Sequence, residues 1–363
     1  MRLNLKRGKT LLVDGPASIT LTSGSAIVLG AKIKVGSNVV VRKGKRLPFE
    51  VMKDAAFELT MGENSTFLEI DGTATPDSWR DAVDEILKLN GPSSILILGG
   101  VDSGKTSFCT YLANRALGER WGVRLIDGDL GQSDIGPPAT IGLASVTEPI
   151  IDPFKVEAES VVFVGTTSPS RALNTCLNAL KSLKERYTAK GRDLLIVNTD
   201  GWIEGEDAVN YKAQVVDLFS PDVIVVIQEE DELKPVIKRL RDSRIIVVEV
   251  PKTIKRRSRE VRKALREMAY KKYLKGAKFR SYVLNYIEIR GFTAEADSPV
   301  GSEKDEGLLV GLEDREGRFL GIGILSAINH DRRTLKVYTS VREPSPRIVL
   351  GEVRLSFGGN EIS

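Results

Sequence analysis

The sequence predicts an α/β protein in which a central domain with a mostly parallel sheet is flanked by an N-terminal and a C-terminal all-β domain. Three observations support this class. Short alternating segments with turn residues between them fill residues 1–72, continuous apolar runs separated by longer helical segments fill 73–277, and alternating segments return over 278–363. Continuous apolar runs are typical of parallel strands buried on both faces, and alternation is typical of strands with one solvated face. We therefore expect three domains with these boundaries.

The N-terminal part should form strands separated by glycine-containing turns. The expected strands lie at residues 18–22, 26–30, 38–41 and 57–60, with turns at Gly15-Pro16, Gly24, Gly36 and Gly44. A helix over 79–89 should follow, with Asp77 or Ser78 as its N-cap and Asn90-Gly91-Pro92 at its end.

The central and C-terminal parts differ in the pattern of their expected strands. Buried strands are expected at 95–98, 123–126, 161–164, 194–197, 223–227 and 245–248, with a helix over 106–117. Half-buried strands are expected at 282–284, 287–289, 308–312, 319–324, 335–338 and 348–350. The first set predicts a parallel sheet with crossover helices, and the second an all-β module.

Composition excludes several classes of protein. The 363 residues are 41% hydrophobic and 28% charged, without an apolar run near the roughly 20 residues that cross a bilayer. We expect a cytoplasmic protein without a membrane partner. The two cysteines, Cys109 and Cys176, are too few for a disulfide framework or a thiolate zinc site, and His330 is the single histidine. Catalysis therefore has to depend on carboxylates, Lys, Arg, hydroxyls, backbone amides or a hard metal ion.

A glycine-rich loop provides the strongest motif. Gly99, Gly100, Val101, Asp102, Ser103, Gly104, Lys105 and Thr106 match GxxxxGK[ST] between an expected strand and an expected helix, and Ser107 follows. In this motif the backbone N–H groups surround the β-phosphate, the lysine reaches the β- and γ-phosphates, and the threonine hydroxyl binds Mg²⁺. The motif predicts that residues 99–107 bind a nucleoside triphosphate. ATP is favoured, because the Asn/Thr-Lys-x-Asp signature of guanine-reading GTPases is absent from residues 226–231.

Carboxylates follow two of the expected strands, at the sheet edge where the phosphate loop also lies. Asp127 and Asp129 come after strand 123–126, and Asp200 comes after strand 194–197. A carboxylate at this edge could hold Mg²⁺ through water or accept a proton from an attacking hydroxyl. The spacing does not choose among the three.

A basic segment runs from Lys252 to Arg280, with thirteen Lys or Arg and two Glu. Its local charge is +11, so the rest of the chain carries −7 against a total of +4. Such a concentration indicates phosphate handling, although a solvated helix face is the simpler alternative. Residues 261, 264, 265 and 268 give it an apolar stripe.

Five motifs in this order resemble one family, the polynucleotide 5′-hydroxyl kinases related to the RNA cleavage-factor and ribosomal-RNA-processing kinases, here of the archaeal kind. The motifs are residues 99–106, 127–132, 163–169 and 198–202, and the Arg-rich stretch after Pro251. The resemblance covers nearly the whole chain, including both β modules.

The resemblance implies roles for particular residues. Asp129 would be the general base and, with Thr106, a metal ligand, and Gln132 would position the substrate. Thr199, Gly201 and Trp202 would belong to a clasp over the phosphate loop, with Trp202 stacking on a terminal base, although a core tryptophan is the alternative. Arg257 and Arg262 would be the arginines of a mobile lid at about 251–277, and would act with Lys105 on the transferred phosphate.

We therefore predict a kinase that uses ATP and Mg²⁺, or another divalent cation, to phosphorylate the 5′-hydroxyl of RNA. DNA is a second acceptor that the sequence leaves open. Two alternatives remain. The chain could be a non-catalytic ATP-binding subunit of an RNA-processing assembly, or a nucleotide-hydrolysing switch that turns over without an oligonucleotide.

Overall fold

The computed structural model describes residues 1–188, 191–240, 243–291, 305–329 and 331–362. His330 lies outside them. The chain divides into two compact units, one of Met1–Leu125, Ser145–Val156 and Ala189–Val261, and the other of Ile126–Ala144, Glu157–Thr188 and Arg262–Ser363. Because each unit combines separate stretches of sequence, the three-domain boundaries expected above stay a prediction.

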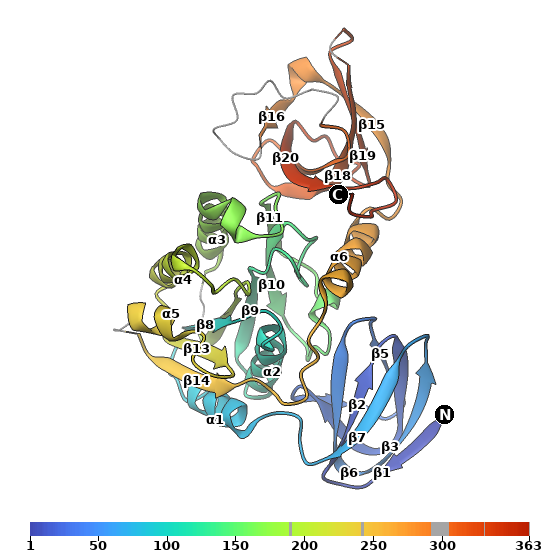
Figure 1. The fold of residues 1–363 in the computed structure, drawn as a ribbon, viewed down its shortest axis with the longest axis vertical. Coiled ribbons are helices and arrows are strands. Elements are labelled where there is room, and N and C mark those ends of the chain that lie inside the picture. Colours follow the sequence, from blue (N-terminus) through green and yellow to red (C-terminus); the bar gives the residue numbers. More distant parts are fainter. Residues whose placement is uncertain (189–190, 241–242, 292–304, 330, 363) are drawn as a thin grey trace. The chain divides into compact units, whose positions relative to one another are not determined.

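The N-terminal residues form a seven-stranded antiparallel sheet (Figure 1). Its strands are β1 (Arg2–Leu5), β2 (Lys9–Asp14), β3 (Ala17–Val28), β4 (Ala31–Ile33), β5 (Asn38–Val41), β6 (Arg46–Met61) and β7 (Thr66–Asp71). Alternate residues of β3 and β6 are buried, including Ile19, Leu21, Phe49 and Phe57, as the period of two requires. These side chains form the core of the sheet.

The expected turn at Gly24 is wrong. Residues 18–22 and 26–28 belong to the single strand β3, which pairs with β6 along its length. The pairing register shifts between Leu21 and Ala26 instead. A Cβ at Gly24 would lie 2.1 Å from the carbonyl oxygen of Asp54, so the glycine permits a close backbone approach inside the irregular stretch.

The central sheet is mostly parallel, as predicted. Its order is β11-β10-β9-β12-β8-β13-β14. The strands are β8 (Ser93–Gly99), β9 (Gly122–Asp127), β10 (Thr140–Val146), β11 (Ser160–Phe163), β12 (Asp193–Asn198), β13 (Val223–Gln228) and β14 (Ile245–Glu249). Strands β12 and β13 both pair in parallel with β8, and β11 pairs antiparallel with β10. β10 was not expected from the sequence. Because its partners flank β8 on both sides, the strand that precedes the glycine-rich loop is central and fully covered.

Among the described residues of this α/β part, the helices are α1 (Asp77–Ile86), α2 (Lys105–Gly118), α3 (Leu173–Arg186), α4 (Glu206–Phe219) and α5 (Lys234–Arg239). Helix α1 packs on β14, and α2 packs on β8 and β12. The expected Asp or Ser cap of α1 is wrong, because the N-cap residue is Pro76 and no side chain caps the helix. Asp77 instead occupies the first turn, where a negative charge is favourable.

The C-terminal sheet has the order β15-β19-β18-β17-β20-β16. Its strands are β15 (Lys278–Val283), β16 (Glu288–Arg290), β17 (Leu308–Glu313), β18 (Phe319–Asn329), β19 (Thr334–Thr339) and β20 (Arg347–Arg354). The strand expected at 282–284 begins earlier, at Lys278, and residues 284–286 form a short 3₁₀ turn.

Helix α6 (Arg259–Tyr273) lies in the basic segment. The apolar stripe expected at 261, 264, 265 and 268 is only partly right. Leu265, Ala269 and Tyr270 are buried, whereas Val261 is 37% exposed. Tyr270 packs in a cluster with Leu274 and Ile324 of β18. Because of this packing, the buried residues lie in the second half of the helix and not at Val261.

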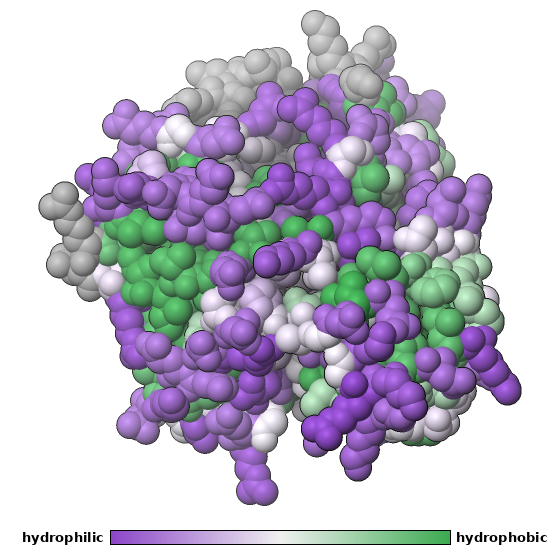
Figure 2. All heavy atoms as spheres, turned by 60° about the horizontal axis from the view of Figure 1, so that its bottom comes forward, coloured by the Kyte–Doolittle hydropathy of each residue, from purple (hydrophilic) through white to green (hydrophobic). Residues whose placement is uncertain are grey.

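The surface, the helices and the two cysteines each show one further feature. On the face shown in Figure 2, polar side chains predominate and apolar ones gather in separate patches. In the described ranges no helix has the length and apolarity needed to cross a bilayer. Cys109 and Cys176 are both buried, at 1% and 0% exposure.

Candidate active site

The glycine-rich loop connects β8 to α2, as the sequence predicts. Gly104 is the N-cap of α2 with φ of 100°, a conformation that favours glycine. A Cβ at Gly99 would lie 2.4 Å from Ser103 Oγ and 3.0 Å from the Ile227 carbonyl oxygen, so the position leaves little room for a side chain. The first N–H groups of α2 therefore begin directly after the loop, which is the arrangement that binds a phosphate.

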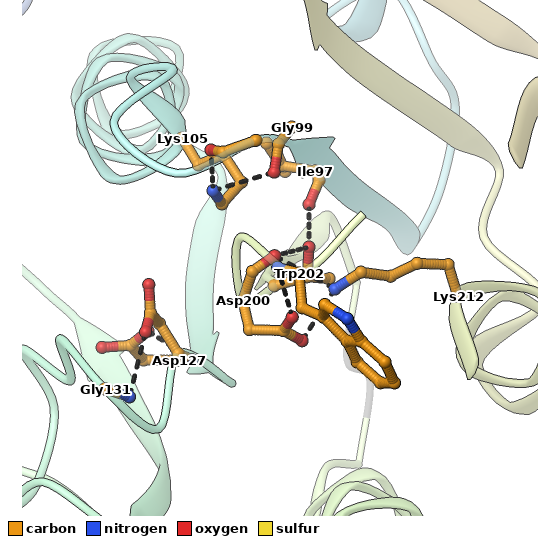
Figure 3. A network of polar contacts seen from close by, with 11 residues as sticks. Ile97, Gly99, Lys105, Asp127, Gly131, Asp200, Trp202 and Lys212 are labelled. Carbon is orange, nitrogen blue, oxygen red and sulfur yellow. Dashed lines mark hydrogen bonds and ion pairs between the residues drawn. The ribbon is translucent and has the colours of Figure 1, made fainter. Parts of the chain in front are cut away.

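Lys105 and Thr106 open the helix. Lys105 is 6% exposed, and its Nζ donates to the carbonyl oxygens of Gly99 at 3.0 Å and Gly100 at 2.7 Å (Figure 3). These bonds hold the ammonium against the loop. Asn198, the last residue of β12, donates from Nδ2 to Thr106 Oγ1 at 3.4 Å. Asn198 thereby orients the hydroxyl that the motif assigns to Mg²⁺.

The predicted lid arginine Arg257 pairs with a residue of the glycine-rich loop. Asp102 accepts from Arg257 Nε at 2.7 Å and from its backbone N–H at 2.8 Å. The side chains are 19% and 5% exposed, so the pair is largely shielded from water. Asp102 has φ of 57°, an uncommon value for a residue other than glycine. The chain before α6 is thus fastened to the loop that begins α2.

The segment after β12 crosses the same loop. A Cβ at Gly201 would lie 2.8 Å from both N and Cα of Val101, so only glycine permits this approach. Thr199 is buried and donates from Oγ1 to the Ile97 carbonyl oxygen of β8 at 2.8 Å. Its hydroxyl is therefore used to hold the segment on β8, and a role in binding substrate stays a prediction.

Asp200 has a structural role. Its Oδ2 accepts from Lys212 Nζ of α4 at 2.7 Å, and its Oδ1 accepts from the Trp202 backbone N–H at 2.9 Å (Figure 3). Lys212 is 0% exposed and also donates to the Asp200 carbonyl oxygen at 3.0 Å. Both carboxylate oxygens are thus engaged, which argues against Asp200 as the proton acceptor considered from the sequence.

Trp202 is half-buried rather than a core residue. Its ring lies 6.1 Å from that of Tyr211 of α4, tilted by 31°. One part of the indole is supported by the helix, and another part is accessible to solvent. A supported, accessible ring is what stacking on a base requires.

In the other compact unit, Asp127 organises the loop after β9. Its Oδ2 accepts from the backbone N–H of Asp134 at 2.7 Å and of Ile135 at 3.2 Å, and its Oδ1 accepts from that of Asp129 at 3.3 Å. Asp127 is 3% exposed. A buried carboxylate that accepts several backbone bonds stabilises a loop, and it is a poor candidate for accepting a proton from substrate.

Asp129 occupies a different environment in the same loop. It is half-buried, and its Oδ1 accepts from the N–H groups of Gly131 at 3.1 Å and Gln132 at 2.9 Å. Gln132 in turn donates from Nε2 to the Arg262 carbonyl oxygen of α6 at 3.2 Å. The backbone turn fixes the direction of the Asp129 carboxylate, and Gln132 links this turn to the first half of α6.

Three residues that position the site were given no such role from the sequence, although one of them, Asn198, lies in the motif at 198–202. Trp79 of α1 is 1% exposed, and its ring would lie 3.3 Å from a Cβ at Gly104. Its Nε1 donates to the Glu249 carbonyl oxygen at 2.8 Å. Lys212 and Asn198 are the others. The available signal for Lys212 was its spacing from Ala208 and Val215, which puts a lysine on the apolar stripe of a helix.

A second set of ion pairs fastens the segment before α6. Asp14 of β2 accepts from Arg46 Nε at 2.8 Å and lies 3.2 Å from Lys255 Nζ. Arg46 also donates to the Thr253 carbonyl oxygen at 3.0 Å. Burial alone would raise the pKa of Asp14, but hydrogen bonds from Arg46, Thr66 and Lys255 lower it to about 2.

The protein oxygen atoms at the phosphate loop suit a divalent cation that is bound mainly by the phosphates of the nucleotide. In the part of the chain that the structure describes, no group of three or more His, Cys, Asp or Glu side chains could hold a metal ion. Mg²⁺ usually takes one or two protein oxygens and completes its shell with phosphates and water. The Thr106 hydroxyl is such an oxygen.

The fold and the loop define a P-loop nucleotide-binding protein. A profile of the family described as "mRNA cleavage and polyadenylation factor CLP1 P-loop" matches residues 99–276. A polyribonucleotide 5′-hydroxyl-kinase of Pyrococcus horikoshii is 29% identical over 352 residues, covering 83% of this chain and 96% of the relative. One of Methanocaldococcus jannaschii is 27% identical over 343 residues, covering 80% and 94%.

Solved structures agree on the fold. The Clp1p of a wild-type Clp1p–Pcf11p complex superimposes with a TM-score of 0.79 at 15% identity, covering 98% of this chain and 97% of that one. The resemblance inferred from five motifs is confirmed, because relatives named polyribonucleotide 5′-hydroxyl-kinase are similar to this chain over most of its length.

Proposed function

We propose that this chain transfers the γ-phosphate of ATP to the 5′-hydroxyl of RNA. The kinase class and the use of ATP accord with the family. The observation that carries the proposal is the packing of Gly201 on Val101, which brings the half-buried Trp202 next to a complete phosphate-binding loop. A nucleotide holder needs the loop alone, whereas an accessible aromatic ring beside it suits an acceptor with a base. DNA with a free 5′-hydroxyl is the second acceptor class.

The chemistry needs a proton acceptor, and we assign it to Asp129. The 5′-oxygen bonds to the γ-phosphorus, the bond to the β,γ-bridging oxygen breaks, ADP leaves, and the hydroxyl proton passes to the Asp129 carboxylate. Asp129 is the better candidate because its side chain is half-buried, whereas Asp127 and Asp200 are only 3% and 5% exposed and have both carboxylate oxygens held by hydrogen bonds within the fold.

Charge on the transferred phosphate would be neutralised by Lys105 and by the lid arginines Arg257 and Arg262. A divalent cation, Mg²⁺ in the simplest case, would bind Thr106, with Asp129 as its second protein ligand. When bound, it supplies positive charge to the phosphate oxygens. Arg257 would have to exchange Asp102 for phosphate to take part.

The test is transfer of labelled phosphate from ATP to a 5′-hydroxyl oligoribonucleotide by wild type, Lys105→Ala, Asp129→Asn and Asp127→Asn. Asp129→Asn keeps an oxygen that can accept from Gly131 and Gln132, so its fold should persist while kcat falls by roughly 10²- to 10⁴-fold. Asp127→Asn is the matched control, and we expect it to lower thermal stability more than Asp129→Asn does.

The outcomes separate the candidate functions. Retained activity in Asp129→Asn would refute the assignment of the base. Wild-type protein that binds ATP without transferring phosphate would be a nucleotide-holding subunit, and phosphate release without an oligonucleotide would indicate a switch.

A further inference from the structure

Three aromatic rings form an exposed cluster in the C-terminal sheet, and we call it the aromatic trio: Phe279 of β15, Tyr338 of β19 and Phe357, which follows β20. The ring centroids of Phe279 lie 5.1 Å from Tyr338 and 5.3 Å from Phe357, and those of Tyr338 and Phe357 are 5.6 Å apart. Phe279 is 49% exposed and Phe357 is 40% exposed. Aromatic side chains this exposed and this close together mark a binding surface more often than a core.

Strand pairing explains why these rings face outward. Phe279 lies directly opposite Tyr338 in the antiparallel register, and the next pair, Arg280 with Val337, points to the other face. Val337 is fully buried, so that second face is the interior of the sheet. Tyr338 also packs on the buried cluster of Tyr270 and Leu274, which supports the trio from below. The rings are therefore held rigidly with their outer surfaces accessible.

Lysines accompany the trio. Lys336 lies two residues before Tyr338 on the same strand face, and its Nζ is 4.8 Å from the centroid of the Phe279 ring. Lys275 and Lys278 lie just before Phe279 in the sequence, but the alternation of β15 puts Lys278 on the opposite face from the rings. Lys271 contacts the loop of Phe357, because a Cβ at Gly359 would lie 3.0 Å from Lys271 Cγ. All four lysines are exposed.

These four lysines differ from the basic residues nearer the start of the basic segment. Over the described ranges none of the four has an ion-pair partner, whereas Lys255, Arg257 and Arg266 pair with carboxylates. Solvated, unpaired ammonium groups beside exposed rings offer positive charge without a protein counter-ion.

We propose that the aromatic trio and the adjacent Lys271 and Lys336 bind single-stranded RNA, as a second site for the substrate strand beyond its 5′ end. The inference rests on the proposed function. Bases stack on exposed aromatic faces regardless of their identity, and phosphates bind the flanking lysines. An apolar protein partner would bury the rings but would leave the two adjacent lysine charges unneutralised, so the combination favours a strand that carries both bases and phosphates.

The experiment measures RNA length dependence in the full chain. Kinase KM and kcat are determined for a 5′-hydroxyl dinucleotide and a 20-nucleotide strand, and affinity for a 3′-labelled strand is measured by fluorescence anisotropy without ATP. The variants are Phe279→Ala with Phe357→Ala, and Lys336→Glu, which preserves the packing of the rings. Tyr286→Ala is the control, because this ring is 81% exposed in the same sheet domain and lies outside the trio.

We expect the double variant and Lys336→Glu to weaken binding of the long strand and raise its KM by about tenfold or more, with kcat and the dinucleotide KM unchanged. Lys336→Glu should also reduce the salt dependence of binding. Unchanged affinity for the long strand in both variants would overturn the proposal, as would an equal loss with the dinucleotide. Failure of the proposed function would appear differently, as RNA bound by wild type without phosphate transfer.

Discussion

The buried pair of Lys212 and Asp200 allows a prediction whose size follows from the structure. Lys212 is 0% exposed and the Asp200 side chain 7%, with 2.7 Å between Nζ and Oδ2. Replacing Lys212 by Met keeps the length of the side chain and removes the charge. Asp200 is then left as a buried carboxylate without its cation, so the free energy of unfolding should fall by about 3–5 kcal/mol.

The double variant Lys212→Met with Asp200→Asn is the matched control. It removes both charges, and the new amide oxygen can still accept from the Trp202 N–H. Because neither partner then carries an uncompensated charge, we expect it to recover at least half of the lost stability. Lys212→Met should also lower kinase kcat/KM, since Asp200 fixes the segment that lies on the phosphate loop.

The measurement is urea unfolding followed by tryptophan fluorescence. All three tryptophans, Trp79, Trp121 and Trp202, lie between residues 79 and 202, so the signal reports on the part that contains the pair. A loss below about 1 kcal/mol in Lys212→Met would refute the reasoning, and so would a double variant as unstable as the sum of the single ones.

Three further predictions concern the phosphate loop and its attachments. Gly201→Ala should lower kcat/KM for ATP about tenfold, since the new Cβ would overlap the loop backbone, while Gly118→Ala, with nothing within 4 Å, should leave activity unchanged. Asp14 has a pKa of about 2 in the folded protein against 3.8 ordinarily, so its ionised form contributes roughly 1–2 kcal/mol to stability. This contribution should be complete above about pH 4 and should be lost as the pH falls toward 2. The variant Asp14→Asn should not show this loss. Asp102→Asn should speed amide hydrogen exchange over residues 255–258 by about tenfold, because the paired arginine is released.

Each of these predictions has an outcome that contradicts it. Equal activity of the two alanine variants would show that the loop yields at Gly201. Parallel acid denaturation curves for wild type and Asp14→Asn would show that this carboxylate carries little of the acid sensitivity. Unchanged exchange over 255–258 in Asp102→Asn would show that other contacts hold the segment.

Much of the fold could be predicted because the signals for many strands, helices and loops lie within one short stretch of sequence. The strand expected at 95–98 and the helix expected at 106–117 correspond to β8 and α2, and the glycine-rich loop joins them. The apolar run, the glycines and the lysine are all contiguous there, so the evidence for the loop lies within one stretch of sequence. The Gly24 turn failed for the opposite reason, since β6, a distant partner, keeps the strand paired through the glycine.

The site was harder to predict wherever the partners are far apart in sequence. Asp127, Asp129 and Asp200 looked equivalent, because each follows an apolar strand. Their roles separate only when the hydrogen-bond donors are known, and Lys212 is on another element. Arg257 was expected to face phosphate, but its pairing with Asp102 across 155 residues could not be inferred from either motif alone.

The two buried cysteines give the protein one thiol in each compact unit, Cys109 in the first and Cys176 in the second. Neither can be alkylated until the packing around it opens, so the rate of modification of each thiol measures how often its own unit opens. Mass spectrometry of the peptides would tell the two rates apart without any substitution. Each compact unit therefore contains its own probe of opening. Comparing the two modification rates with and without ATP or RNA would show which unit the ligand stabilises.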